Sequence, residues 1–238
     1  MTIRTKRARS PRGSGDLLAD EIIAAATSLV LRESDPMAIS IRSVAAKVGV
    51  SPPAIYLHFA DKNELLNAVC GRYFERLDDA LAPAEAISDD SLEQLLALGK
   101  AYVKFGLASP VLYKMAFTNS GRDGQWTRVD ELLASTAFVR MGRVVGRLAD
   151  EGFFDVEPDD RPKLALELWS IAHGLVDLIV SKPGLPWGDD LEFAEDVLRA
   201  SAVGLAVGAT SGNRASMVDL RRWVTTARAA PGGGEQAR

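Results

Sequence analysis

Apolar residues recur three or four positions apart along nearly the whole chain, which is the spacing of one face of an α-helix. The pattern is clearest over residues 17–30, 91–107, 126–151, 162–181 and 189–210. No segment shows the strict alternation of apolar and polar residues that indicates a half-buried strand. The pattern therefore predicts an all-α protein with about nine or ten helices.

Capping residues mark the ends of the predicted helices in the first third of the chain. Ser40 can cap a short helix that Gly49 ends, and Ser51 followed by Pro52 can begin the next one. Residues 61–64 (DKNE) match a capping box for a longer helix. Two short helices followed by a long one are therefore expected.

Proline and further caps divide the rest of the chain. Pro83 is expected to break the long helix and to place a domain seam near residue 80. Ser91 with Gln94 is a second capping-box match, and Asp189 can open the last long helix. Residues 215–229 can form one more helix.

Length and composition exclude several classes of protein. The 238 residues are 47% apolar and 25% charged, as in folded proteins. The apolar run 202–209 has eight residues, whereas a membrane span needs about 20. A single cysteine excludes an internal disulfide, and two histidines are few for a zinc site. We expect a cytoplasmic protein without a membrane span, a metal or a cofactor.

The charge is distributed unevenly along the chain. The net charge is −4, but residues 1–72 carry +3 and residues 73–238 carry −7. Five arginine or lysine residues between positions 4 and 12 precede the first acid, Asp16. A basic arm on an acidic body is typical of an end that binds phosphate groups, although a solvated tail has the same composition.

Residues 40–66 combine a short helix, a tight turn at Gly49, a second short helix and the start of a long third helix. This is the helix-turn-helix pattern, in which the second helix can lie in a DNA major groove while the first crosses the backbone. The spacing alone is not specific, because any corner between two helices shares it.

The residues that follow the turn make the pattern specific. Residues 56–66 (YLHFADKNELL) resemble the Y-x-H-F-x-x-K-x-x-L-L signature of the TetR family of transcriptional regulators. Residues 44–45 (VA) and 49–51 (GVS) also stand where that family places such residues. The resemblance covers about residues 15–70. Trp169 with residues 173–174 (HG) resembles the "WHG" subgroup of TetR C-terminal domains.

The side-chain chemistry and the resemblance give the same role to Tyr56, His58 and Lys62. A phenol, an imidazole and an ammonium group at these positions can reach phosphate oxygens and fix the register without reading the sequence. The residues expected to form the core of this region are Val44, Val50, Ile55 and Phe59.

Base readout is expected from the start of the second helix, helped by the helix before it. The candidate residues are Ser51, Pro52, Pro53 and Ala54, with Ser40 and Arg42. Proline and alanine cannot hydrogen-bond a base edge and can only touch apolar surface, chiefly thymine methyl groups. Arg42 is then the candidate for the main hydrogen-bonding reader, and the basic arm could enter an adjacent minor groove.

Aromatic and methionine residues at helical spacing fill the C-terminal half, as they fill ordinary cores. As a set they could also line an apolar cavity with a polar handle. The resemblance implies a small, largely apolar effector that binds there and releases DNA. The candidate effector-binding residues are Tyr102, Phe105, Tyr113, Phe117, Trp126, Phe138, Met141, Trp169 and His173.

Small residues on the last two long helices are the candidate dimer interface. Ala200, Gly204 and Gly208 lie four residues apart, and Ala172 lies on the preceding helix. Small side chains allow close helix approach, and in TetR-like proteins these two helices pair with their symmetry mates. A homodimer reads two half-sites, so the operator is expected to be a palindrome in double-stranded DNA.

The resemblance thus implies an N-terminal three-helix DNA-binding domain followed by a larger helical effector-binding and dimerisation domain. The predicted segments are a basic flexible arm (1–15), the DNA-binding domain (16–72), the effector-binding and dimerisation domain (73–212) and a short helix with a disordered tail (213–238). The implied function is a ligand-responsive repressor.

Two alternatives remain beside this function. A helical enzyme could use His173 with Asp177, one turn apart, and Glu167, but no nucleophile, phosphate loop or metal set accompanies them. A helical adaptor without DNA binding is also conceivable, although the presence of Tyr56, His58 and Lys62 argues against it. We therefore expect no enzymatic activity.

Overall fold

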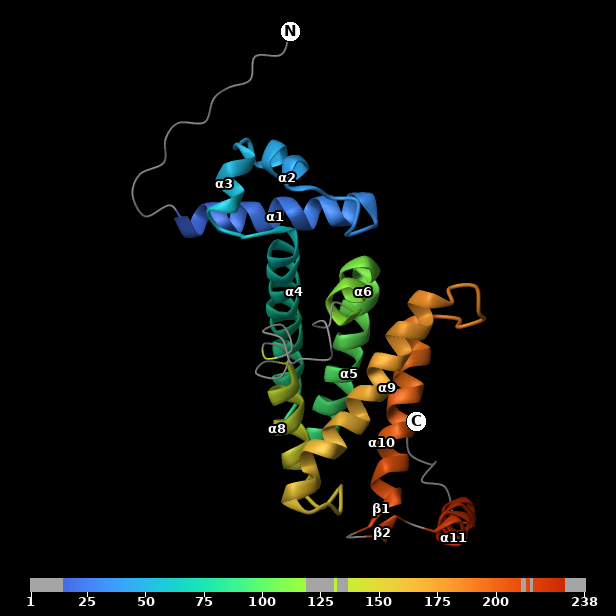
Figure 1. The fold of residues 1–238 in the computed structure, drawn as a ribbon. Helices are drawn as coiled ribbons and strands as arrows, with labels where there is room; N and C mark the ends of the chain where they lie inside the picture. Colours follow the sequence, from blue (N-terminus) through green and yellow to red (C-terminus); the bar gives the residue numbers. More distant parts are fainter. Residues whose placement is uncertain (1–14, 119–130, 132–136, 211–212, 215, 230–238) are drawn as a thin grey trace. The chain divides into compact units, whose positions relative to one another are not determined.

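The computed structural model describes residues 15–118, 131, 137–210, 213–214 and 216–229. Within this part nearly every element is an α-helix, and the two strands that it contains are two residues long each (Figure 1). The all-α class predicted from the periodicity is confirmed. The predicted candidate Trp126 and the basic arm lie outside the described residues.

From α1 to α6 and from α8 to α10 the helices follow one another with connections of ten residues or fewer, as the caps and prolines predict. The α-helices are α1 (Gly15–Glu33), α2 (Ile41–Val48), α3 (Pro52–Tyr56), α4 (Lys62–Glu85), α5 (Ser91–Ala108), α6 (Pro110–Thr118), α8 (Ala137–Asp150), α9 (Arg161–Ser181), α10 (Asp190–Gly208) and α11 (Met217–Ala229). The remaining elements are the 3-10 turn η2 (Pro158–Asp160) and the antiparallel strands β1 (Ala209–Thr210) and β2 (Asn213–Arg214).

The chain forms two compact units. The first, here called the headpiece unit, comprises the residues up to Pro83 together with Lys104–Val139. The second, here called the body unit, comprises Ala84–Val103 together with the residues from Arg140 onward. Each unit combines segments that are far apart in the sequence, whereas the expected domains are continuous ranges. The expected domain boundaries therefore stay a prediction.

The headpiece unit is built around α1. This helix contacts α2 and α6, and α2 in turn contacts α3 (Figure 1). Three of the expected core residues, Val44, Ile55 and Phe59, are buried, whereas Val50 is only half-buried. Aromatic rings fill the other end of the unit, where Tyr73 and Phe74 of α4 contact rings of α5 and α6.

Most of the expected helix starts are observed, with two corrections to the capping. Ser51 precedes α3 but its side chain makes no capping bond, because prolines fill the first two helical positions and the Ala54 N–H donates to the Ser51 carbonyl oxygen. Asp90, not Ser91, caps α5, since its carboxylate accepts the N–H groups of residues 92 and 93. The Ser91 hydroxyl instead donates to Glu151 at 2.6 Å.

Pro83 does not break the long helix where the sequence led us to expect a break. It lies inside α4, which continues to Glu85. The two residues beyond the proline are held by packing and charge, because Ala84 is buried and the Glu85 carboxylate pairs with Arg140 in a largely buried ion pair. Such tertiary contacts can outweigh the local cost of a proline near a helix end.

The body unit is held together by close packing of its helices. α9 packs against α10, and Gly99 of α5 lets α10 approach so closely that an added Cβ would lie 2.9 Å from a methyl group of Leu198. Among the described residues, the segment Pro158–Ser181 is long and apolar enough to cross a membrane. Seven of its apolar side chains are buried in the protein, whereas Leu166 and Leu178 are 46% and 51% exposed.

Candidate nucleic-acid interface and sensor site

The turn between α2 and α3 has the geometry that a helix-turn-helix requires. Gly49 ends α2 in the left-handed conformation, with φ 83°. Its N–H and that of Val50 both donate to the Ala45 carbonyl oxygen, at 2.9 and 3.0 Å. Positive φ is easy for glycine and strained for other residues. Gly49 therefore sets the angle at which α3 leaves α2.

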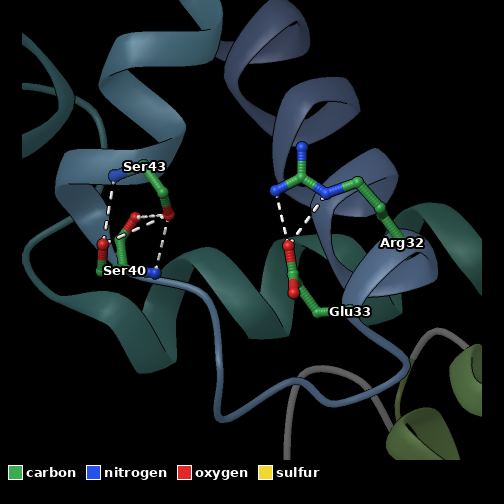
Figure 2. Close-up of polar contacts among 4 residues, drawn as sticks. All are labelled: Arg32, Glu33, Ser40 and Ser43. Atoms are coloured by element: carbon green, nitrogen blue, oxygen red, sulfur yellow. Dashed lines mark hydrogen bonds and ion pairs between the residues drawn. The ribbon is translucent and has the colours of Figure 1, made fainter.

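Two serines hold the start of α2. The Ser40 hydroxyl accepts the Ser43 N–H at 3.1 Å, and the Ser43 hydroxyl accepts the Ser40 N–H at 2.9 Å (Figure 2). This reciprocal pair is a capping box in which serine takes the place of the usual glutamate. Ser40 is exposed, but its side chain is engaged in fixing the helix start.

The cations of the headpiece unit differ in how far they are neutralised. Arg32 donates to the neighbouring Glu33 carboxylate at 2.5 and 2.9 Å (Figure 2), and Arg72 pairs with Asp20 and Glu75. Arg42 on α2 is exposed and makes no hydrogen bond or ion pair with the residues that the structure describes. Arg42 therefore keeps its full donor capacity for a partner.

The start of α3 presents the other predicted base readers to solvent in part. Ser51 and Pro53 are exposed, while Pro52 and Ala54 are half-buried. The only fully buried residue of α3 is Ile55. The sequence reasoning passed over Leu57, which directly follows α3 and is 83% exposed.

The three predicted phosphate contacts lie close together in sequence at the end of α3 and the start of α4. Tyr56 is 53% exposed and His58 is half-buried beside Phe59, with the ring centroids 6.5 Å apart. The Lys62 ammonium group donates to the Met37 carbonyl oxygen at 2.8 Å and so ties α4 to the connection between α1 and α2. Two of its three N–H donors remain for a further partner.

The predicted effector-binding residues fall into the two units. Tyr113 is buried and Phe105 and Phe117 are half-buried in the headpiece unit. The Phe105 ring lies 4.8 Å from that of Tyr73, and the Phe117 ring lies 5.2 Å from that of Phe74 and 4.9 Å from that of Tyr113, between centroids. Phe138 is half-buried in the same unit. Tyr102, Met141, Trp169 and His173 belong to the body unit. Tyr73 and Phe74, which sequence reasoning missed, follow the apolar spacing of α4.

Three of the residues in the body unit form a connected group. The Tyr102 hydroxyl lies 3.0 Å from His173 Nδ1, and the Trp169 and His173 rings lie 5.1 Å apart between centroids. Burial lowers the pKa of His173 below its ordinary value, and the negative charge of Asp177 opposes this shift. This shift favours the neutral form of His173, which can both donate and accept a hydrogen bond.

The body unit also contains a small cavity, which none of Tyr102, Trp169 and His173 lines. It has a volume of about 20 Å³ and is lined by apolar residues of α5, α8, α9 and α10, among them Met141, Leu168 and Ala172. A space of this size holds about one water molecule. Of the predicted effector-binding residues, only Met141 lines it.

The predicted interface residues do not share one environment. Ala200 and Gly204 are exposed and Gly208 is half-buried on α10. A Cβ added at either glycine would meet no atom within 4 Å, so packing within this chain does not require glycine at these positions. Ala172 is 1% exposed and packs inside the body unit.

Two family models match the chain. The model described as bacterial regulatory proteins of the tetR family matches residues 22–69, and the model for a tetracyclin repressor-like C-terminal domain matches residues 95–211. The first range contains α2, α3 and most of α1, and the second contains Tyr102, Trp169 and His173. The predicted resemblance is therefore confirmed in both parts of the chain.

Individual proteins agree with the models. An uncharacterized HTH-type transcriptional regulator of Mycobacterium tuberculosis is 31% identical over 83 residues, which are 34% of this chain and 36% of that protein. A protein of unknown function from Rhodococcus sp. RHA1 is 27% identical, with a TM-score of 0.66, over 85% of this chain and all of that one. RolR in complex with resorcinol is 19% identical, with a TM-score of 0.60, over 87% of this chain and all of that one.

The matched family and the curated relative are transcription regulators and not enzymes. The helix-turn-helix geometry of α2 and α3, the exposed Arg42 on α2 and the two matched models agree with one another. The chain belongs to the TetR family of DNA-binding transcription regulators.

Proposed function

We propose that the protein is a repressor that binds a palindromic operator as a homodimer in the cytoplasm and leaves it when a small, largely apolar effector binds. The observation that carries this proposal is the accessibility of the helix-turn-helix side chains. Arg42 and Tyr56 are exposed on a unit whose core is complete without them. Side chains that do not pack in the core are available to bind DNA.

The DNA contacts divide into two kinds. Tyr56, His58 and Lys62 would hold phosphate oxygens and position the headpiece unit. Arg42, Ser51 and the residues at the start of α3 would face the base edges, because the second helix of this motif enters the major groove. The Ser40 hydroxyl already caps α2, so Ser40 would support DNA binding by fixing the start of that helix.

The homodimer would form through α9 and α10. Gly204 and Gly208 leave open space on α10, where Ala200 is exposed as well. The apolar side chains of Val203 on α10 and Leu178 on α9 are 40% and 51% exposed. A face that combines small and exposed apolar residues can pack closely against its symmetry mate. Ala172 is left out of this interface, because it is buried within the chain.

The effector would be recognised by Tyr102, Trp169 and His173, and Met141 stays a prediction for the same role. A neutral imidazole, a phenol and an indole offer hydrogen bonds and ring stacking without net charge, which suits an uncharged aromatic or hydroxylated molecule. RolR, whose fold is similar, has been solved with resorcinol, a molecule of this kind. Phe105, Tyr113, Phe117, Trp126 and Phe138 stay predictions for the same role.

The test begins with double-stranded DNA selected from a random library by the full-length protein. We expect a palindrome, a complex of two chains per duplex, and an affinity that falls as salt is raised. Lys62→Ala should weaken binding, and Lys62→Arg, which keeps the charge, is its control. Selection that enriches no sequence, together with binding that salt does not change, would favour an adaptor that does not bind DNA.

A further inference from the structure

The outer face of α3 is apolar. Pro53, Tyr56 and Leu57 are spaced i, i+3 and i+4, so they lie on one side of a helix. Leu57 keeps helical backbone angles, with φ −73° and ψ −17°, and thus extends this face by one residue. All three residues are exposed, while Ile55 on the opposite side is buried.

Leu57 is the most exposed large apolar side chain among the described residues, at 83%. A single exposed leucine is common on protein surfaces. Here, however, the leucine lies between two residues that are candidates for DNA contact, Tyr56 and His58, and on the helix that enters the groove in this motif. Its position, and not its exposure alone, indicates a partner.

The hydrogen-bonding capacity of this face is small. Pro53 and Leu57 have no side-chain donor or acceptor, and Tyr56 has only its hydroxyl group. In the major groove, the apolar feature that distinguishes one base from the others is the C5-methyl group of thymine. An apolar face in that groove can therefore discriminate thymine from cytosine by contact alone.

We propose that the outer face of α3 reads its operator through thymine methyl groups, with Leu57 as the specificity-determining residue. This inference rests on the proposed DNA-binding function and adds to it the chemistry of the readout. Positioning would come from the flanking polar groups of Tyr56, His58 and Lys62. Leu57 would then contribute discrimination between base pairs, and Arg42 on α2 the main hydrogen bonds.

The experiment uses the full-length protein and the duplex selected from a random library. Each thymine is replaced in turn by deoxyuridine, symmetrically in both half-sites, which removes only the C5-methyl group. Burial of one methyl-sized group corresponds to about fourfold in affinity, so loss of one contacted methyl per half-site should weaken binding roughly 15-fold. At least one thymine per half-site should behave in this way.

A double-mutant cycle assigns the contact to Leu57. In Leu57→Ala the sensitive position should lose most of its preference for thymine over deoxyuridine. Leu185→Ala is the matched control, because Leu185 is also an exposed leucine, at 50%, but lies in the body unit. This control should retain the full preference. An unchanged melting temperature for each variant ensures that the comparison concerns binding alone.

Two results would overturn the inference while the proposed function stands. Deoxyuridine without effect at every position, with salt-dependent binding of the selected duplex intact, would mean that α3 does not read methyl groups. A full thymine preference in Leu57→Ala would remove Leu57 as the reader. If no duplex is enriched and salt has no influence, the proposed function itself fails, and the inference fails with it.

Discussion

The two units of this protein use their polar and aromatic residues in opposite ways. In the headpiece unit, Arg42 and Tyr56 are exposed and contribute little to the core. In the body unit, Tyr102 is 5% exposed and is joined to the half-buried His173. Arg42 and Tyr56, two of the side chains proposed to contact DNA, are thus open to solvent, whereas Tyr102 and His173, proposed for effector binding, hydrogen-bond to each other.

This difference indicates which substitutions should change function without changing stability. Removing an exposed polar group loses only the interaction with its future partner. Removing a buried one also leaves a neighbouring polar atom without its bond, which costs about 1–3 kcal/mol. Substitutions of Arg42 and Tyr56, which are exposed in the headpiece unit, should therefore change DNA binding alone. Substitutions of Tyr102 and His173 in the body unit should change stability together with the proposed effector response.

The largest effect is expected from a substitution in the proposed dimer interface of the body unit. Gly204→Leu places a large side chain on the proposed interface, and overpacking costs about 1–3 kcal/mol at each of the two symmetry-related positions. We expect the dimer to dissociate at micromolar concentration in sedimentation experiments, with the helical content unchanged. The headpiece unit should then bind one half-site only weakly.

The control for this prediction is another glycine with open space around it. Gly184 lies in the connection between α9 and α10, and an added Cβ would meet no atom within 4 Å. Gly184→Leu should leave the dimer intact. A stable dimer in Gly204→Leu as well would place the interface elsewhere on the chain.

The second effect concerns charge in the headpiece unit. Lys62→Ala removes one proposed phosphate contact per half-site, which should flatten the plot of log affinity against log salt by about 0.9 for each contact. At 0.15 M salt this corresponds to roughly 30-fold weaker binding for the dimer. The loss should be similar for all DNA sequences, as fluorescence anisotropy with several duplexes can show. A changed sequence preference would instead make Lys62 a base reader.

The third prediction removes the same atom from two tyrosines. Tyr102→Phe deletes the hydroxyl group that meets His173 and should lower the free energy of unfolding by about 0.5–1.5 kcal/mol, with operator affinity unchanged. Tyr56→Phe should leave the stability unchanged and weaken operator binding. Denaturant melts and binding titrations of the two variants test this directly, and equal effects of both on stability would contradict the contrast between the units.

The sequence predicts the headpiece unit better than the body unit, for physical reasons. Local signals determine the headpiece: the Ser40 cap, the Gly49 turn and the prolines of α3 act within a few residues. In the body unit, contacts between residues far apart in the sequence also determine the local structure. Ser91 binds Glu151, sixty residues away, and leaves the capping of α5 to Asp90.

The same reasoning explains the other mismatches. Pro83 does not end α4, because Ala84 and Glu85 find partners far along the chain. Ala172 has the small size expected at an interface, but size alone does not reveal which face of α9 is buried. The sequence pattern assigns no role to Leu57, because only the structure shows that this side chain is exposed.

The smallest effect is expected from the pH dependence of His173. Burial lowers the pKa of His173 in the folded protein, whereas the unfolded chain has the ordinary value of about 6.5. Between the two pKa values the unfolded chain binds the proton more readily. Stability should therefore fall as the pH is lowered through about 6.5 toward the folded pKa, by at most about 1.4 kcal/mol for each unit of difference between the two pKa values. His173→Gln should remove this part of the pH dependence, as urea melts at a series of pH values can measure. His58→Gln is the matched control, because it removes the same side chain from the headpiece unit and must retain the contribution of His173. An identical pH dependence in wild type and His173→Gln would mean that burial does not lower the pKa of His173 in the folded protein.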